Sequence, residues 1–374
     1  MRVIHPVLTA CIQFSLQVLL SSGLSDYRIS GNSEVADSIR IGLLIQDKNS
    51  TAALRASELA VQKANQNGGV NGLSIRLVVR SMEGTWGTGS REAVSLIFDE
   101  NVIGILGSHD GRNAHLVEQV AARSRVVFIS AWTSDPTLSQ AFVPWFFNCV
   151  PTDIQQALSL TGEIYSRRKL SRIAVISDSG YDSQSALNNF IKVESGENRP
   201  QPLKISIDNN TNIPELSVKL KSSDIQGIIL FVQPPLSAKI AEGLKIQNDS
   251  LPVFGTIALL DENKISVQDM KNYEKLIIVS PGSLSGNVNT AFRDDYKKAY
   301  GIFPGSVASF AFDGMNLLIE AIRKSGPGYE NMQKELYETR YNGVTGIIQF
   351  DKRGNRKGTP GIVEIKNGIP IHLK

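Results

Sequence analysis

Cysteine is almost absent from this sequence, which contains only Cys11 and Cys149 among its 374 residues. Cys11 lies in an apolar N-terminal stretch of the kind that export removes, which would leave Cys149 alone. The exported chain is therefore predicted to have no internal disulfide bond. Its stability would then depend on burial of a hydrophobic core.

The sequence also has little excess charge. Its formal net charge is +3, and lysines and arginines are mixed with acids, as in Asp351-Lys352-Arg353. A basic run with interleaved aromatic residues does not occur, so the sequence argues against a nucleic-acid partner. The composition, 41% hydrophobic and 20% charged, is typical of a globular protein. Because the chain is longer than one core usually supports, two domains are expected.

Histidine is scarce as well, with four residues in the chain. His109, His115 and His372 have no metal-ligand spacing with cysteines or carboxylates, and neither a Gly-x-Ser-x-Gly elbow nor a phosphate-binding glycine loop occurs. We therefore predict a protein that is not an enzyme and that uses no cofactor and no metal. General-base chemistry by His109 with Asp110 stays open as an alternative.

The most apolar stretch of the chain, residues 7–20, follows Arg2 near the N-terminus. It predicts a signal peptide over residues 1–25, followed by a polar linker over residues 26–37. A membrane span needs about 20 apolar residues, and this stretch is shorter. We therefore predict a periplasmic or other extracytoplasmic protein without stable membrane insertion. A lipobox-like sequence ends at Cys11, so lipid anchoring through this residue stays open.

After the linker, apolar runs alternate with helical patterns. The first series of runs predicts strands at residues 38–45, 73–79, 102–106 and 126–129. A second series begins after Thr152 and Gln155, which have capping-box spacing. It predicts strands at residues 172–176, 204–207, 227–231, 252–254 and 276–280. This alternation predicts an α/β fold with parallel sheets, in which ligands gather beyond the carboxyl ends of the strands.

Near the C-terminus, the sequence predicts a long amphipathic helix over residues 307–322. Residues 346–350 and 361–365 are two further apolar runs on either side of a turn. They are expected to form a hairpin with each other.

Several motifs follow one another in an order that resembles a known family. They include Ile129-Ser130-Ala131-Trp132-Thr133-Ser134-Asp135-Pro136 and Ile176-Ser177-Asp178-Ser179-Gly180-Tyr181. Further segments lie at residues 65–75, 103–108, 292–304, 311–313 and 343–354. The ordered set resembles the type I periplasmic solute-binding proteins of the leucine/isoleucine/valine-binding class.

This resemblance implies two Rossmann-like lobes with parallel sheets, joined by three hinge crossings. We place the first lobe at residues 38–150 plus 282–343 and the second at residues 151–281 plus 344–374. The family implies a small solute held between the lobes and delivered to the permease of an ABC transporter. A ligand-sensing subunit of a membrane receptor, using the same cleft, stays open as the alternative function.

The first expected ligand-binding segment consists of Ser108, His109, Asp110 and Gly111. It leads from a buried strand into a helix, whose first N–H groups suit a carboxylate or another electronegative group. In the resembled family a serine stands at the position of Gly111, so this chain keeps only the backbone donor. The alternative reading is that Asp110 caps the helix.

The second expected segment, Trp132, Thr133 and Ser134, follows the next strand. The resemblance implies that Trp132 and Ser134 contact the solute. From the other lobe, the resemblance implies that Tyr181 closes over the solute; the next residue is Asp182, where the family usually has glycine. Gln233 could offer its amide to the solute, or it could have a structural role in a turn.

Ile257 stands where amino-acid-binding members of the family have an acidic residue. A buried ammonium group would lack a counter-charge there, unless Asp110 or Asp47 supplies it. We therefore predict a small polar organic solute, whether amino-acid-like, an amide or a carboxylate. The sequence does not identify it further.

Overall fold

The computed structural model describes residues 38–140, 143–197, 199–247, 251–266, 268–282 and 287–373. The predicted signal peptide, the linker and Cys11 lie outside these residues. None of the helices in the described part of the chain has the length and apolar character of a membrane span.

The first sheet has five parallel strands in the order β2-β1-β3-β4-β5. The strands are β1 (Ser38–Ile45), β2 (Ser74–Ser81), β3 (Gly104–Ser108), β4 (Val127–Ser130) and β5 (Phe146–Asn148). Their alternating side chains enter two separate cores, as Leu43 and Leu44 do in β1. Helices must therefore cover both faces.

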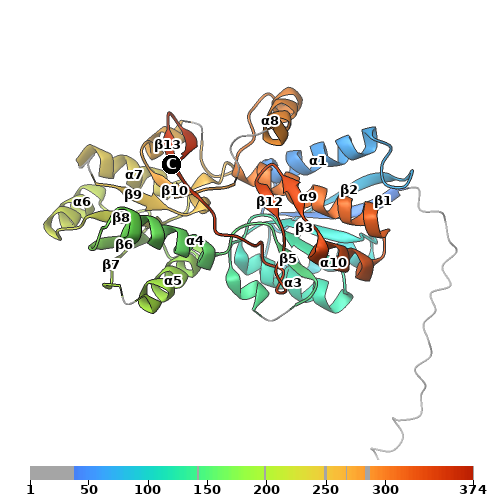
Figure 1. The fold of residues 1–374 in the computed structure, drawn as a ribbon, viewed down its shortest axis with the longest axis horizontal. Helices are drawn as coiled ribbons and strands as arrows, with labels where there is room; N and C mark the ends of the chain where they lie inside the picture. Colours follow the sequence, from blue (N-terminus) through green and yellow to red (C-terminus); the bar gives the residue numbers. More distant parts are fainter. Residues whose placement is uncertain are drawn as a thin grey trace, which may run out of the picture. The chain divides into compact units, whose positions relative to one another are not determined.

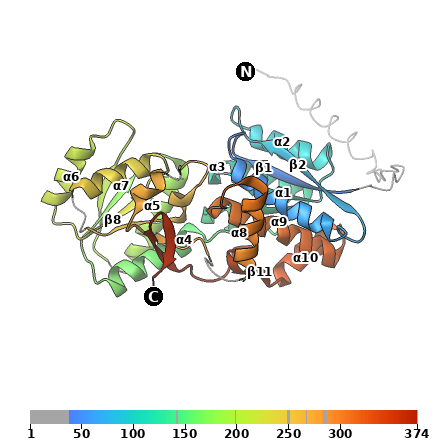
Figure 2. The ribbon, with the colours of Figure 1, turned by 90° about the horizontal axis from the view of Figure 1, so that it is seen from above.

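One face of the first sheet is covered by α1 (Thr51–Gln66) and α9 (Ser306–Ser325), which lie side by side in both ribbon views (Figure 1, Figure 2). The opposite face is covered by α2 (Thr88–Phe98) and α3 (Gly111–Ser124). The alanine-rich face of α1 allows this helix to pack closely on the sheet. The helix α10 (Tyr329–Glu338) packs against α9, and α8 (Asn287–Tyr300) against α1.

The second sheet has the order β14-β13-β10-β9-β8-β6-β7. Its parallel part consists of β6 (Ile173–Ser177), β7 (Leu203–Ser206), β8 (Gly227–Phe231), β9 (Val253–Gly255) and β10 (Ile277–Val279). This part repeats the strand order of the first sheet. The helices α4 (Asp153–Thr161) and α5 (Tyr181–Gly196) cover one face, and α6 (Ile213–Ser222) and α7 (Leu236–Gln247) the other. The predicted capping box of Thr152 and Gln155 at the start of α4 is confirmed.

The predicted hairpin between residues 346–350 and 361–365 is wrong. Instead, β12 (Gly346–Ile348) pairs with β11 (Tyr341–Gly343), and β13 (Ile362–Lys366) pairs with β14 (Ile369–His372) and with β10, all antiparallel. The turn between β13 and β14 is Asn367-Gly368, with φ angles of 53° and 72°. Asn-Gly is the preferred pair for a two-residue hairpin turn, and the sequence interpretation had overlooked it.

The chain passes between the two sheets three times: after β5, after β10, and between β12 and β13. Arg356 lies in the third passage and ties it to the first passage and to β12, because its guanidinium donates to the carbonyl oxygens of Cys149, Thr345 and Ile347. In α9, the buried Asp313 accepts from the backbone N–H groups of Val344 and Thr345, at 2.8 and 2.9 Å, and from the Thr345 hydroxyl. The first and third crossings are therefore held by a buried polar network.

The predicted lobe boundaries, 38–150 plus 282–343 and 151–281 plus 344–374, stay a prediction. The segment after β12 lies along β5, since the N–H of Asn148 donates to the carbonyl of Gly354 and Phe350 stacks edge-on against Phe147. These contacts favour placing the end of the first lobe beyond residue 343.

We expect Asp313→Ala to lower the free energy of unfolding by about 3 kcal/mol or more, because it leaves three buried donors without their acceptor. Urea unfolding followed by circular dichroism measures this change. The control is Glu320→Ala on the same helix, which removes a surface pair with Arg323 and should cost less than about 0.5 kcal/mol. Equal losses in the two variants would contradict the assigned role of the network.

Candidate functional site

The two sheets reverse their strand order at equivalent points, between β1 and β3 and between β6 and β8. Ligands of such sheets bind outside the carboxyl ends of the strands at these points. At the first point, the Gln46 amide and Asp110 exchange two hydrogen bonds of 3.1 Å. At the second, the Asp178 carboxylate accepts from the N–H of Gln233 at 2.8 Å. Hydrogen bonds therefore hold the loops at each point in place.

A small cavity lies where these edges face each other, and we call it the cleft pocket. Its walls combine residues that follow the first sheet with residues from the second: Trp132, Thr133, Ser134, Val150, Gln156, Asp182, Gln233, Ile257 and Ala258. The cavity has about 20 Å³, which is space for about one water molecule. A solute the size of leucine therefore enters only when the two edges move apart.

Asp153 lies at the back of the cleft pocket and is 3% exposed. Its carboxylate accepts from the hydroxyls of Ser134, at 2.6 Å, and Ser185, at 2.7 Å. Burial raises the pKa of Asp153 to about 7, although the two hydroxyls oppose the shift. The Ser134 hydroxyl is thus oriented by a carboxylate behind it.

Side chains that follow the second sheet accept hydrogen bonds from the first turns of three helices that pack on the first sheet. At α1, the N–H of Ala52 donates to the Asn263 amide oxygen at 3.1 Å. At α9, two N–H groups donate to the two carboxylate oxygens of Glu262, at 2.8 and 2.7 Å. Neither α1 nor α9 has a side-chain cap from its own N-cap residue. Contact across the cleft therefore satisfies N–H groups that each helix leaves unpaired.

At α3, the N–H of Gly111 donates to Asp182 Oδ1 at 3.0 Å. Asp110, the N-cap of α3, accepts instead from the N–H of Asn113 at 2.8 Å. The capping interpretation of Asp110 is therefore what the structure shows. The positive end of α3 is occupied by two carboxylates, one from each side of the cleft.

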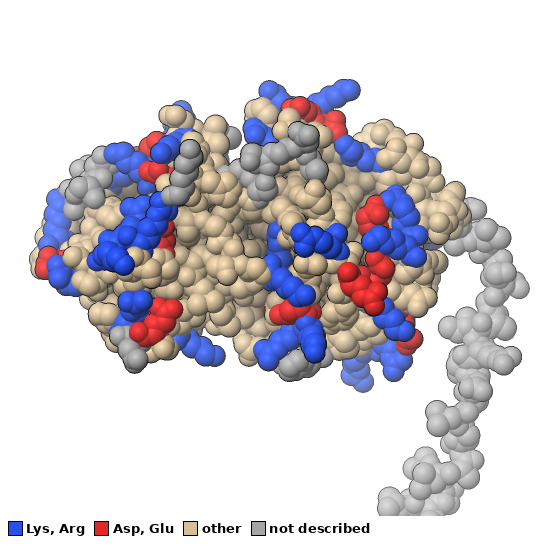
Figure 3. All heavy atoms as spheres, in the orientation of Figure 1, with Lys and Arg blue, Asp and Glu red and all other residues tan. Residues whose placement is uncertain are grey.

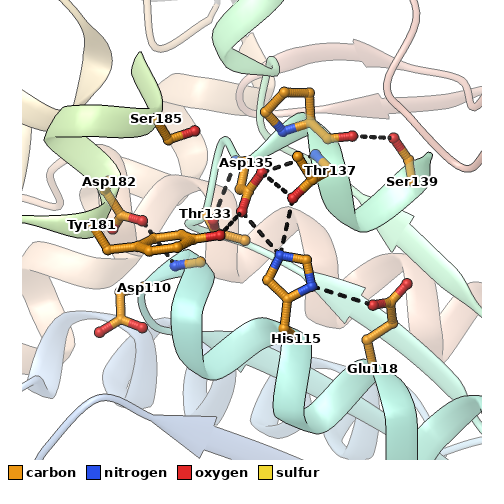
Figure 4. A network of polar contacts seen from close by, with 12 residues as sticks. Asp110, His115, Glu118, Thr133, Asp135, Thr137, Ser139, Tyr181, Asp182 and Ser185 are labelled. Carbon is orange, nitrogen blue, oxygen red and sulfur yellow. Dashed lines mark hydrogen bonds and ion pairs between the residues drawn. The ribbon is translucent and has the colours of Figure 1, made fainter. Parts of the chain in front are cut away.

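A chain of polar contacts extends from Tyr181 into the first sheet's loops (Figure 4). The Tyr181 hydroxyl donates to Asp135 Oδ2 at 2.7 Å, and His115 Nε2 lies 3.1 Å from the same oxygen. Hydrogen bonds to Asp135 and Glu118 raise the pKa of His115 to about 9. Burial acts to raise the pKa of Asp135, but bonds from His115, Thr137 and Tyr181 outweigh it and lower that pKa to about 2. His115 and Asp135 are therefore a charged pair at neutral pH.

Residues 38–367 match the family model described as "Periplasmic binding protein". The chain belongs to the periplasmic binding protein family. Members of this family bind solutes and are not enzymes, so the match agrees with a cleft built for binding. None of the curated protein sequences compared with the chain matches it.

Solved structures of this family share the fold. One is the branched-chain amino acid transporter substrate-binding protein LivJ from Streptococcus pneumoniae, in complex with isoleucine, with a TM-score of 0.78, 19% identity and coverage of 89% of this chain and 97% of that one. The leucine-binding protein LivK from Thermotoga maritima has a TM-score of 0.76 and 18% identity. The match covers 90% of this chain and 98% of LivK. A solute-binding protein from R. palustris, in complex with benzoate, has a TM-score of 0.77 and 17% identity. The match covers 90% of this chain and 95% of that protein. At these identities the likeness shows the fold alone.

The structure brings five of the predicted site residues together in the cleft pocket: Trp132, Thr133, Ser134, Gln233 and Ile257. Contact of any of them with a solute stays a prediction. Ile257 is buried, and its N–H donates to the Gln156 side chain at 3.0 Å. The Thr133 side chain accepts a hydrogen bond from the N–H of Asp135, so it stabilises the loop that carries both residues.

Other predicted residues lie beside the pocket or away from it. Gly111 lies beside the pocket, where its N–H donates to the pocket residue Asp182. Tyr181 is 41% exposed, and its hydroxyl donates to Asp135. Ser108 is buried at the end of β3. His109 is 2% exposed and stacks on Phe128 with ring centroids 6.0 Å apart. This packing turns the ring into the core of the first sheet, which removes the basis for a general base in the cleft.

The sequence interpretation missed Gln156, which lines the pocket, and Asp153, which holds the pocket residue Ser134 from behind. Both follow Thr152 in the first turn of α4, so the capping box at the start of that helix was the available signal. Asp182, which departs from the family's usual glycine, also lines the pocket. Across the described residues, no group of three or more histidine, cysteine, aspartate or glutamate side chains is placed to hold a metal ion.

The His115 pair predicts a pH dependence of stability. The pKa of His115 rises from 6.5 to about 9 on folding, so the pair's contribution is complete below about pH 6.5 and disappears as the pH rises through 9. Because solvent reaches part of the ring, we expect a loss of about 1 kcal/mol over this range. His115→Gln should lack this loss, whereas the surface variant His372→Gln should retain it. Thermal unfolding between pH 6 and 9.5 measures the difference, and parallel curves for wild type and His115→Gln would contradict the pairing.

Proposed function

We propose that this protein captures a small polar organic solute in the cleft pocket and delivers it to the permease of an ABC transporter. We further propose that residues 1–25 direct its export to the periplasm or an equivalent extracytoplasmic compartment. Membership of the periplasmic binding protein family supports both proposals.

One observation carries the proposal: the cleft pocket is built jointly by the carboxyl edges of both sheets. Trp132 offers a flat apolar wall from the first sheet's side, and Gln233 an amide from the second. A solute between them would contact both sheets only when the edges are close together. Its binding energy would therefore favour an arrangement closed around the solute, with the edges somewhat farther apart than in the empty pocket, and a permease can recognise this closure.

The solved relatives indicate which solutes to test first. Those described above are reported with isoleucine or benzoate, or are named for leucine. All three compounds are small and combine an apolar part with a polar end. The Trp132 and Ile257 side chains of this chain suit the apolar part, and the hydroxyl and amide groups suit the polar end.

A thermal-shift screen with amino acids, amides, ureas and small carboxylates tests the proposal. A bound solute at 100 times its dissociation constant should add about 2.7 kcal/mol of stability. For a compound that binds, Trp132→Ala and Gln233→Ala should each weaken affinity about tenfold or more, because each removes one wall of the pocket. Trp86→Ala is the matched control, since Trp86 is 69% exposed and lies outside the pocket. Binding that is unaffected by both pocket variants would contradict the assigned site.

A further inference from the structure

The first N–H of α3 already has an anionic partner from within the protein. Asp182, the second residue of α5, places Oδ1 3.0 Å from the Gly111 nitrogen. Asp110 serves a different N–H of the helix, that of Asn113. The position that a solute carboxylate would take at this helix is thus held by a carboxylate from the second sheet's side.

The space beside the Gly111 Cα is narrow. A Cβ atom at this residue would lie 3.0 Å from Asp182 Oδ1 and 3.0 Å from Thr133 Oγ1. A side chain at residue 111 would therefore crowd these neighbours. A solute carboxylate that bound the Gly111 N–H would have to displace Asp182.

A solute carboxylate beside Gly111 would also meet the negative charge that surrounds Asp182. Burial raises the pKa of its carboxyl to about 6; the Gly111 N–H and Lys264 act in the opposite direction. The charged and titratable groups that face Asp182 from the neighbouring elements are Asp110, Asp135, Asp153 and Lys264. Three of these four are acids, so a second carboxylate would enter a region that is already negative.

We propose that Asp182 determines the solute specificity of the cleft, by occupying the carboxylate position at α3 and thereby excluding carboxylate-bearing solutes in favour of amides and amines. This inference rests on the proposed solute-binding function and narrows its solute class. An amide or amine can donate to the acceptor oxygens of both Asp182 and Gln233. A carboxylate can accept from the Gln233 amide nitrogen, but it has no hydrogen to donate to Asp182 and is repelled by its charge. Asp182 is accordingly a specificity-determining residue.

Matched pairs of compounds test the inference: L-leucine with L-leucinamide, and benzoate with benzamide. Calorimetric titration of the full-length exported chain should show at least one amide bound at least about tenfold more tightly than its carboxylate partner. Asp182→Ala should gain about tenfold or more in affinity for that carboxylate, with no gain for the amide. Asp182→Asn keeps an acceptor for Gly111 and should gain less than Asp182→Ala. Wild-type protein that binds the carboxylates as tightly as the amides, or an Asp182→Ala variant that gains no carboxylate affinity, would overturn the inference.

A second measurement needs no solute. In ¹⁵N-labelled wild-type protein, the Gly111 amide resonance should shift with a midpoint near pH 6, and this shift should vanish in Asp182→Asn. A Gly111 resonance that does not respond to pH would overturn the inference through its structural basis alone. If the resonance titrates but no compound binds to any variant, the proposed function fails, and the specificity role fails with it for that separate reason.

Discussion

Helix N-termini that face the cleft need hydrogen-bond acceptors, and the second sheet supplies them. In parallel sheets each strand leads into a helix whose first N–H groups point out of the carboxyl edge. Here Asn263, Asp182 and Glu262 reach across to α1, α3 and α9. Water can replace these acceptors when the edges separate, so the contact is specific without being permanent. A solute that binds in the cleft has to compete with them or lie beside them.

Carboxylates are the dominant charged groups in and around this cleft. Asp153 and Glu262 are held by hydroxyl and N–H donors, and burial raises the pKa of each to about 7. Asp135 differs, because His115 and two hydroxyls stabilise its ionised form. The cleft therefore combines fixed negative charge with acids that can change protonation as their surroundings change. On the outer surface, by contrast, charges of both signs are interspersed, as the face in Figure 3 shows.

The fold could be read from the sequence to a large extent because its strands are buried on both faces. Such strands appear as continuous apolar runs, and the runs at residues 38–45 and 227–231 coincide with β1 and β8. The errors came where local patterns were short. The C-terminal strands pair through the Asn367-Gly368 turn, and the three-residue β5 carries too few residues for a periodic signal.

The sequence by itself determined the α/β class, the loops on which the polar residues lie and the family that these motifs resemble. These are properties of neighbouring residues, since strand burial, helix caps and turns depend on a few positions at a time. Only the tertiary structure decided which side chains meet: that His109 turns into the core, that Ser134 is held by Asp153, and that Asp182 takes the first N–H of α3. Gly111 and Asp182 are 71 positions apart, and their contact depends on how the two sheets face each other, which no local pattern encodes.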